Sequence, residues 1–258
     1  MPFLDITTSK IYYEVHGDGE TVVLLHHGFG CTEMWEKIWP ALVENGYRVI
    51  MYDRRGYGRS ERGKDFKEFY VSGRFRSESV NDLNQLMDFL QVSSFHLIGQ
   101  CEGGVIAIDY AVKFPERVRT IVTSSTQCFS KIPMSEFHKI KDTNVFQELE
   151  SDLKQKLMEW HGKDRAEAFY NHQFRRYGGA YGKDVFDLRG LLPQVICSVL
   201  VLYPDRSFFF DVEQGVAFYR HLPYGELAVL PKCGHSTYEH QPEEYIRHVV
   251  NFLKRYQH

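Results

Sequence analysis

The chain has 258 residues, of which 43% are apolar and 25% are charged, and its formal net charge is -3. This composition is typical of a soluble globular protein, and the lack of a basic excess argues against a nucleic-acid-binding surface. The apolar stretches are far shorter than the ~20 residues of a transmembrane helix, and the first residues lack the pattern of a signal peptide. An odd number of widely spaced cysteines, five, predicts reduced thiols and a cytoplasmic location.

Short apolar or β-branched runs alternate along the chain with longer segments of helical pattern. We expect strands at residues 11–15, 21–25, 48–52, 95–98, 120–123, 199–203 and 225–230. The connection at residues 17–19 is too short for a crossover, which predicts an antiparallel opening meander. Beyond it, the alternation predicts a largely parallel sheet with helices on both faces, the α/β class.

Three segments have the apolar spacing of helices. Residues 77–90 and 242–256 each have one apolar face, whereas Glu102–Lys113 is apolar nearly all round and is expected to be buried. The two amphipathic segments are therefore expected to cover the sheet, and the third to lie within the core.

Residues 127–193 interrupt this alternation. Segments 146–160 and 165–175 are helical in pattern, and no strong strand occurs before residue 199. We therefore expect an α/β core of residues 1–126 and 194–258 and an inserted helical cap of residues 127–193. The alternative is that the insertion is simply more of the core.

The strongest local pattern is Gly99-x-Cys101-x-Gly103, between an apolar strand and an apolar helix. A nucleophile on a tight strand-to-helix turn has strained backbone geometry, and glycines two positions away avoid clashes. The helix amino terminus also favours an anionic nucleophile or oxyanion. The pattern predicts that Cys101 is a nucleophile, and the alternative is a small cysteine buried at a turn.

This arrangement resembles the α/β-hydrolase superfamily over essentially the whole chain, with cysteine where that family usually has serine. Cysteine at this position is similar to dienelactone hydrolase, whereas the insertion and the turn Gly56-Tyr-Gly-Arg-Ser60 are more similar to the esterase, haloperoxidase and C–C hydrolase branch. The sequence is also compatible with an introduced replacement of serine by cysteine. The resemblance implies the α/β-hydrolase fold, a mostly parallel sheet flanked by helices, with an inserted helical cap.

A second motif, Leu24-Leu-His-His-Gly-Phe-Gly30, resembles the family's oxyanion loop. The resemblance implies that the backbone amides of Phe29 and Glu102 hold the oxyanion. The adjacent His26 and His27 are expected to point to opposite faces and have no partner at ligand spacing, so no metal is expected. His27 is expected to fix the loop by a hydrogen bond.

The arginines of residues 53–60 are expected to be structural, with phosphate binding as the alternative. No glycine-rich nucleotide motif follows a strand, so no cofactor is expected.

The expected base is His235, which follows Gly234 between the last strand and the last helix and matches the family's Gly-His signature. His240 is its nearest competitor. An imidazole in such a loop can activate the nucleophile if a carboxylate holds it in the useful tautomer.

The family's chain order of nucleophile, acid and base implies that Asp205 is the acid, because it follows the strand at 199–203. The family usually has Gly-x-x-Asp there, and here Tyr203-Pro204 stands where glycine is expected. Asp211 is the alternative acid. The other possibility is that Asp205 is a surface residue paired with Arg206, with no catalytic role.

The ionisation of Cys101 depends on opposing effects. The helix terminus and His235 favour the thiolate, whereas burial and Glu102 oppose it. We expect the first pair to prevail, with the thiolate forming below the ordinary value of ~8.5. The Glu102 side chain is expected to turn into the helix flank and accept a hydrogen bond from an arginine of the cap.

Together these patterns predict a cofactor-free hydrolase that cleaves a carboxylic ester, lactone or thioester through an acyl-cysteine. C–C cleavage of a diketone is the first alternative, and a slow ligand-binding receptor on the same fold is the second. The aromatic and cationic residues of the insertion suit a ring-bearing or anionic small molecule. No nucleic acid or membrane partner is expected, and a homodimer is left open.

Overall fold

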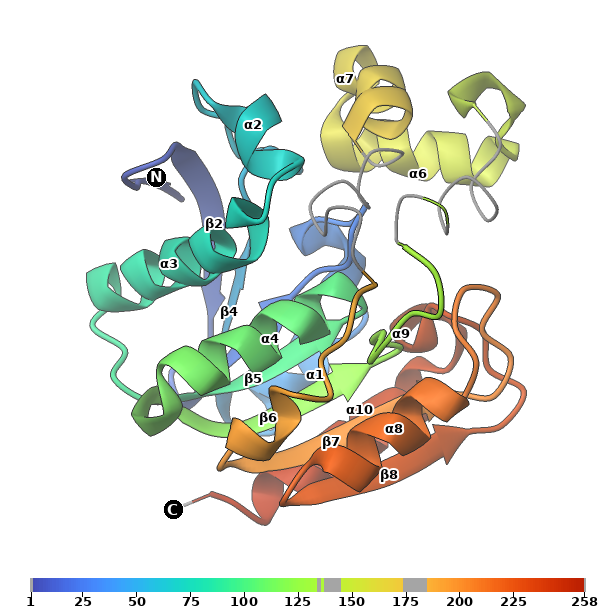
Figure 1. The fold of residues 1–258 in the computed structure, drawn as a ribbon. Coiled ribbons are helices and arrows are strands. Elements are labelled where there is room, and N and C mark those ends of the chain that lie inside the picture. Colours follow the sequence, from blue (N-terminus) through green and yellow to red (C-terminus); the bar gives the residue numbers. More distant parts are fainter. Residues whose placement is uncertain (1, 134–135, 137–144, 174–184, 258) are drawn as a thin grey trace.

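One mostly parallel sheet organises the molecule (Figure 1). The computed structural model describes residues 2–133, 136, 145–173 and 185–257, and within them eight strands pair in the order β1-β2-β4-β3-β5-β6-β7-β8. The strands are β1 Phe3–Asp5, β2 Lys10–His16, β3 Glu20–Leu25, β4 Tyr47–Tyr52, β5 Phe95–Gln100, β6 Val118–Ser124, β7 Ser198–Pro204 and β8 Gly225–Leu230. The six strands β4, β3, β5, β6, β7 and β8 run parallel to their neighbours in the sheet. This confirms the expected α/β class.

The opening strands differ from the expected meander. β2 runs antiparallel to the rest of the sheet, as the short connection at residues 17–19 predicts, but it pairs with β4 instead of β3. The burial patterns explain the order, because β4 is buried at every residue except Arg48 and needs partners on both edges. β2 is partly exposed and lies nearer the sheet edge.

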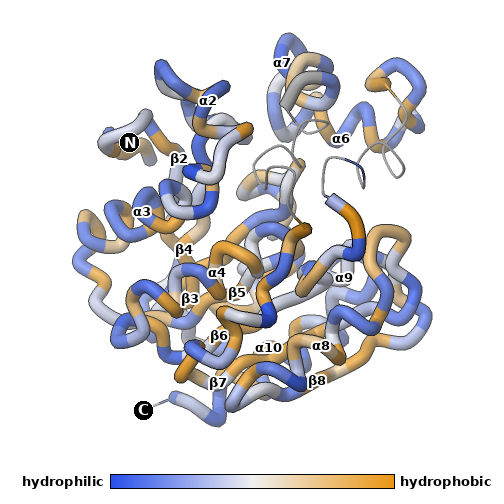
Figure 2. The backbone as a smooth tube through the Cα atoms, viewed as in Figure 1, coloured by the Kyte–Doolittle hydropathy of each residue, from blue (hydrophilic) through white to orange (hydrophobic). Residues whose placement is uncertain are grey.

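Helices cover both faces of the sheet. α3 Arg74–Phe89, α4 Glu102–Lys113 and α8 Glu213–His221 pack on one face, and α1 Trp39–Glu44 and α10 Pro242–Lys254 pack on the other. Figure 2 shows that hydrophobic residues are concentrated in the strands and on the inner helix faces. Shorter elements are α2 Phe66–Tyr70, α9 Thr237–His240, a π-helical turn at Phe169–Gln173 and 3₁₀ turns at Thr32–Trp35, Pro115–Arg117, Phe146–Glu148 and Leu192–Gln194.

Between β6 and β7 the chain leaves the sheet and returns at neighbouring points. Phe129 and Asp187 form an isolated antiparallel bridge, and the Leu188 N–H donates to the Cys128 carbonyl at 2.8 Å. α6 Ser151–His161 and α7 Lys163–Ala168 belong to this insertion, in the segments where helices are expected, and lie above the sheet in Figure 1. Residues 174–184 lie outside the described residues, and a separate cap at 127–193 stays a prediction.

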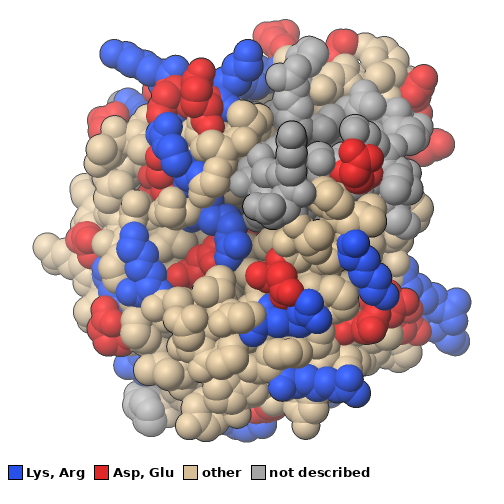
Figure 3. Space-filling model, viewed as in Figure 1, with Lys and Arg blue, Asp and Glu red and all other residues tan. Residues whose placement is uncertain are grey.

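The face drawn in Figure 3 has blue and red side chains interspersed rather than gathered by sign. None of the helices in the described part of the chain is long and apolar enough to cross a membrane.

Candidate active site

Cys101 occupies the turn between β5 and α4, with backbone angles φ 52° and ψ -114°. This left-handed conformation is costly for a residue with a side chain, so the surroundings must hold it in place. The Cys101 N–H donates to the Ser124 carbonyl at 2.8 Å, which ties the turn to β6. Added Cβ atoms at Gly99 and Gly103 would overlap backbone atoms of Gly103 and Leu25, so close approach requires both glycines.

Cys101 and His235 line one small cavity. Its volume is about 30 Å³, space for little more than a water molecule. The other lining residues are His27, Gly28, Phe29, Glu102, Phe209 and Phe210. The structure therefore brings together the expected nucleophile, base and oxyanion residues, and the two phenylalanines narrow the space around them.

His235 is fixed through its backbone and its ring. Its carbonyl accepts hydrogen bonds from Gln100 Nε2 at 2.8 Å and from Ser125 Oγ at 2.6 Å. Its ring Nδ1 lies 3.0 Å from Ser207 Oγ. The residues that orient the imidazole are thus an amide and two hydroxyls at the ends of β5, β6 and β7.

Asp205 is not placed as the sequence predicts. Its carboxylate accepts hydrogen bonds from the backbone N–H groups of Lys232 and Cys233, the latter at 3.0 Å, and these bonds hold its pKa below the ordinary value. Within the described residues no hydrogen bond joins Asp205 to His235. The expected acid–base pair is therefore not formed, because the turn after β7 aims Asp205 at the neighbouring loop and Ser207 at the imidazole.

The alternative acid, Asp211, also lies elsewhere. Its carboxylate accepts the N–H of Glu213 at 2.9 Å at the start of α8. The family's Gly-x-x-Asp spacing does point to Ser207. Pro204 stands where the glycine is expected, and Ser207 is the third residue after it. Gln100 and Ser125 have no comparable sequence signal, because only folding brings them to the His235 carbonyl.

The loop after β3 is held by histidines from two parts of the chain. The Phe29 N–H donates to His27 Nδ1 at 3.3 Å, and His27 Nε2 lies 3.1 Å from the Tyr238 hydroxyl. The Phe29 carbonyl accepts a hydrogen bond from His161 Nε2 at 2.8 Å. His27 therefore fixes the loop, as expected. An anionic oxygen of a ligand would compete with His27 Nδ1 for the Phe29 amide, because it is a stronger acceptor than a neutral ring nitrogen.

His26 faces the opposite side of this loop. Its Nε2 accepts the Arg54 N–H at 3.0 Å, and its Nδ1 lies 2.8 Å from the His27 carbonyl oxygen. Both adjacent histidines therefore use their ring nitrogens in hydrogen bonds with the protein.

The Glu102 side chain forms a buried ion pair with Arg54, and Arg54 also donates to the carbonyls of His26 and His27. This arginine belongs to the loop after β4, so the expected partner from the cap is wrong. Burial raises the pKa of Glu102, while Arg54 opposes that rise. The pair joins the loop after β3 to the residue that follows Cys101. Arg54 is thus structural, as expected.

The ionisation of the site is opposite to the expectation. Burial, and then the Glu102 carboxylate, raise the pKa of the Cys101 thiol to about 12. Burial lowers the pKa of His235 to about 4. At neutral pH the site thus rests as a neutral thiol and a neutral imidazole, because desolvation of the charged forms outweighs the helix terminus.

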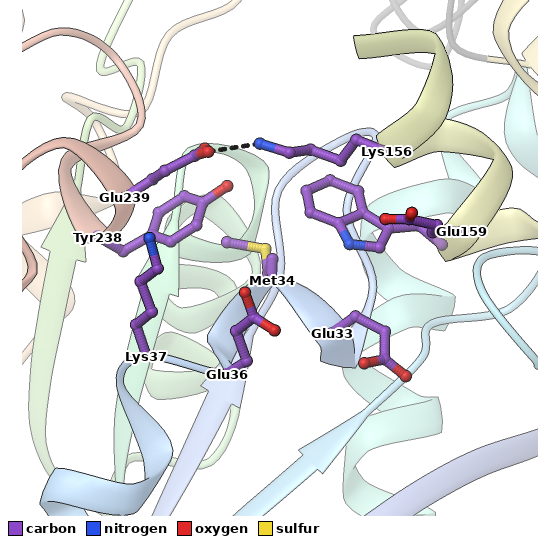
Figure 4. A pocket seen from close by; sticks show the side chains of 9 residues that line it. Glu33, Met34, Glu36, Lys37, Lys156, Glu159, Tyr238 and Glu239 are labelled. Carbon is purple, nitrogen blue, oxygen red and sulfur yellow. Dashed lines mark hydrogen bonds and ion pairs between the residues drawn. The ribbon is translucent and has the colours of Figure 1, made fainter. Parts of the chain in front are cut away.

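A larger pocket of about 390 Å³ adjoins this site (Figure 4). Trp160, Tyr238 and Met34 line it together with charged residues, among them Lys156, whose ammonium pairs with Glu239. Tyr238 also contacts His27, so one side chain links the linings of the two spaces.

Comparison with known proteins identifies the class. Residues 20–151 match the α/β hydrolase fold family, and the chain belongs to that family. It is therefore a hydrolase on the α/β fold, an enzyme.

Individual relatives extend the likeness to the whole chain. The chain is 25% identical over 271 residues, 96% of its own length and 92% of the other, to a 2-hydroxy-6-oxononadienedioate/2-hydroxy-6-oxononatrienedioate hydrolase of Escherichia coli (strain K12 / DH10B). A thermophilic esterase of Thermogutta terrifontis has a TM-score of 0.77 and 21% identity, covering 99% of both chains. The enol-lactonase of Burkholderia xenovorans LB400 has a TM-score of 0.75 and 18% identity, covering 98% of this chain and 100% of that one. The two structures show a shared fold.

Proposed function

We propose that the chain is a cofactor-free hydrolase that cleaves a carboxylic ester, lactone or thioester through an acyl-cysteine on Cys101. The sulfur attacks the carbonyl carbon, the backbone amides of Phe29 and Glu102 stabilise the oxyanion, and the alcohol or thiol leaves with a proton. Water then attacks the acyl-cysteine and releases the acid and the free thiol. His235 handles the protons in both steps.

One observation carries this proposal: Cys101, at a strained strand-to-helix turn, shares a small cavity with His235 and the Phe29 loop. The turn presents the sulfur at the amino terminus of α4, beside the Phe29 loop. A structural cysteine would need neither the left-handed backbone nor the shared cavity.

C–C cleavage of a diketone is the second candidate. It is favoured by the full-length likeness to a hydrolase whose named substrate carries keto, enol and carboxylate groups. The same thiol and oxyanion amides would serve, with a carbon leaving group that must be protonated.

A slow ligand-binding receptor is the third candidate. The raised pKa of Cys101 and the absence, among the described residues, of an Asp205–His235 contact both favour slow chemistry. The three candidates differ in turnover and in the bond that is cleaved, so substrates can separate them.

For all three candidate functions we propose that the ligand is a small ring-bearing or anionic molecule. We propose that residues 127–193 form the cap that selects it. The five free cysteines support the cytoplasmic location that the sequence predicts.

The test compares hydrolysis of chromogenic acetate and thioacetate esters and of a chromogenic vinylogous diketone. Turnover of an ester by the unaltered chain, and its loss by at least about 100-fold in Cys101→Ala, would support the proposal. Cys197→Ala, at a partly buried cysteine outside the cavity, is the matched control and should keep full activity. Ester turnover that survives in Cys101→Ala would overturn the proposal, and cleavage of the diketone alone would favour the second candidate.

A further inference from the structure

The hydrogen bonds around Ser207 define which atom of the His235 ring carries the proton. The backbone N–H groups of Phe209 and Phe210 each donate to Ser207 Oγ at 3.2 Å. A hydroxyl oxygen has two acceptor lone pairs and one hydrogen, so these two bonds use its whole accepting capacity. The remaining contact, 3.0 Å to His235 Nδ1, is then made by the Ser207 hydrogen.

We infer that Ser207 is a positioning residue that donates to His235 Nδ1 and holds the neutral imidazole in the tautomer with its proton on Nε2. The inference about the tautomer stands on contacts alone, and its catalytic meaning rests on the proposed function. Nδ1 is used by Ser207, so Nε2 is the ring nitrogen left for the cavity that His235 shares with Cys101.

This tautomer has the opposite effect to that of a triad carboxylate. An aspartate accepts the Nδ1 proton and leaves Nε2 free to take a proton from the nucleophile. With Ser207 donating, Nε2 already carries the ring proton and can donate a hydrogen bond to a developing oxyanion or a leaving group. His235 is thus set as a hydrogen-bond donor, and it can take the Cys101 proton only after the ring proton moves from Nε2 to Nδ1.

The packing around the ring supports the neutral state. The rings of Phe209 and Phe210 meet the imidazole edge-on, with centroid distances of 4.9 and 5.6 Å. Asp205 faces the backbone of the neighbouring loop instead of the ring. An imidazolium would therefore have apolar neighbours and a hydroxyl where a triad supplies a carboxylate.

The same geometry predicts how a carboxylate would act at this position. In Ser207→Asp the side chain would accept the two backbone N–H groups that already converge there, and a third acceptor site would remain for the His235 Nδ1 proton. The substitution should therefore reverse the tautomer and leave Nε2 basic. It should raise Cys101-dependent ester turnover by at least about tenfold, the low side of what general-base catalysis contributes.

The deciding experiment is a two-bond ¹H–¹⁵N correlation spectrum of the ¹⁵N-labelled resting protein at neutral pH, without substrate. The signals of His235 are assigned by their loss in His235→Gln. We expect the Nε2-protonated pattern in the unaltered chain and in Ser207→Thr, which keeps the hydroxyl, and the Nδ1-protonated pattern in Ser207→Asp. A mixed pattern in Ser207→Ala would add support.

An Nδ1-protonated ring in the unaltered chain would overturn the inference, as would a tautomer that Ser207→Asp leaves unchanged. If Ser207→Asp does not fold, the unaltered chain and Ser207→Thr still decide the question. The spectrum needs no turnover, so failure of the proposed function, seen as ester hydrolysis independent of Cys101, is a separate result.

Discussion

Cys101 is the proposed nucleophile, and the surroundings of its thiol keep it protonated. Burial raises its pKa to about 12, and the Glu102 carboxylate adds to the rise. His235 does not offset this, because burial lowers its pKa to about 4 and so disfavours the imidazolium. A resting ion pair is therefore disfavoured from both sides, and proton transfer accompanies each turnover.

The first prediction concerns this ionisation. Ultraviolet absorbance of the thiolate, followed against pH with Cys101→Ser as the blank, should show no Cys101 step between pH 5 and about 9. The reason is that the pKa of the thiol in the folded protein, about 12, lies above this range. A step near pH 6 or 7 would mean that an imidazolium–thiolate pair forms after all.

The second prediction concerns Asp205, whose carboxylate binds backbone N–H groups of the neighbouring loop. An asparagine keeps an acceptor oxygen there, so Asp205→Asn should change ester turnover by no more than about threefold. The kcat of a triad aspartate variant would instead fall by about 10⁴-fold. A loss of that size would restore Asp205 as the acid.

At the scale of elements, α6 contacts the loops that follow β3 and β4. His161 accepts the Gly58 N–H on Nδ1 at 3.0 Å and donates from Nε2 to the Phe29 carbonyl at 2.8 Å. Its ring stacks on Phe169 at a centroid distance of 3.7 Å, and burial lowers its pKa to about 4, so the neutral tautomer is defined. A helix of the insertion therefore holds the loop that carries Phe29, whose backbone amide is the proposed oxyanion donor.

The third prediction follows from this contact. His161→Leu removes the hydrogen bond to Phe29 and should lower kcat for an ester by about tenfold or more, less than complete loss of an oxyanion donor. KM should change little, and His161→Gln, which keeps a donor, should recover part of kcat. Unchanged kcat in His161→Leu, with normal thermal unfolding, would show that the loop holds its position without α6.

The sequence predicts regular elements well and loop contacts poorly. Glu102–Lys113 forms α4 with the expected bounds because its apolar pattern and the Gly99 and Gly103 spacing agree. The position of β4 between β2 and β3, and the hydrogen bonds of Gln100 and Ser125 to the His235 carbonyl, depend on how segments meet in space. The ionisation of Cys101 was not predictable because it depends on burial, which a pattern does not measure.

At the scale of the whole molecule, the two helical layers bury polar groups whose charge state affects folding. Asp82 on α3 is 3% exposed, and burial raises its pKa to about 7. Its carboxyl is hydrogen-bonded to Thr8 Oγ1 at 3.0 Å. The pKa of this carboxyl is near 4 in the unfolded chain and about 7 in the folded protein. Between these two pH values the folded state binds more protons, so stability falls as the pH rises through that range.

The fourth prediction is that Asp82→Asn stabilises the fold at pH 8 by about 1–3 kcal/mol, because the amide avoids a buried charge. The gain should shrink towards pH 4, where Asp82 is protonated in the folded state and close to half protonated in the unfolded state. Asp88→Asn, at an exposed position of the same helix, is the control and should stay within about 0.5 kcal/mol. Denaturant unfolding at the two pH values measures both, and an equal gain at each would contradict the assignment.

In the proposed reaction an acyl group is carried on the Cys101 sulfur. Rapid acid quenching during turnover of a chromogenic ester, followed by mass spectrometry of the intact chain and of its peptides, tests it most directly. We expect a mass increase of one acyl group, located on the peptide that contains Cys101 and absent from Cys101→Ala. Turnover without any acylated chain, or an acyl group located on another residue, would contradict it.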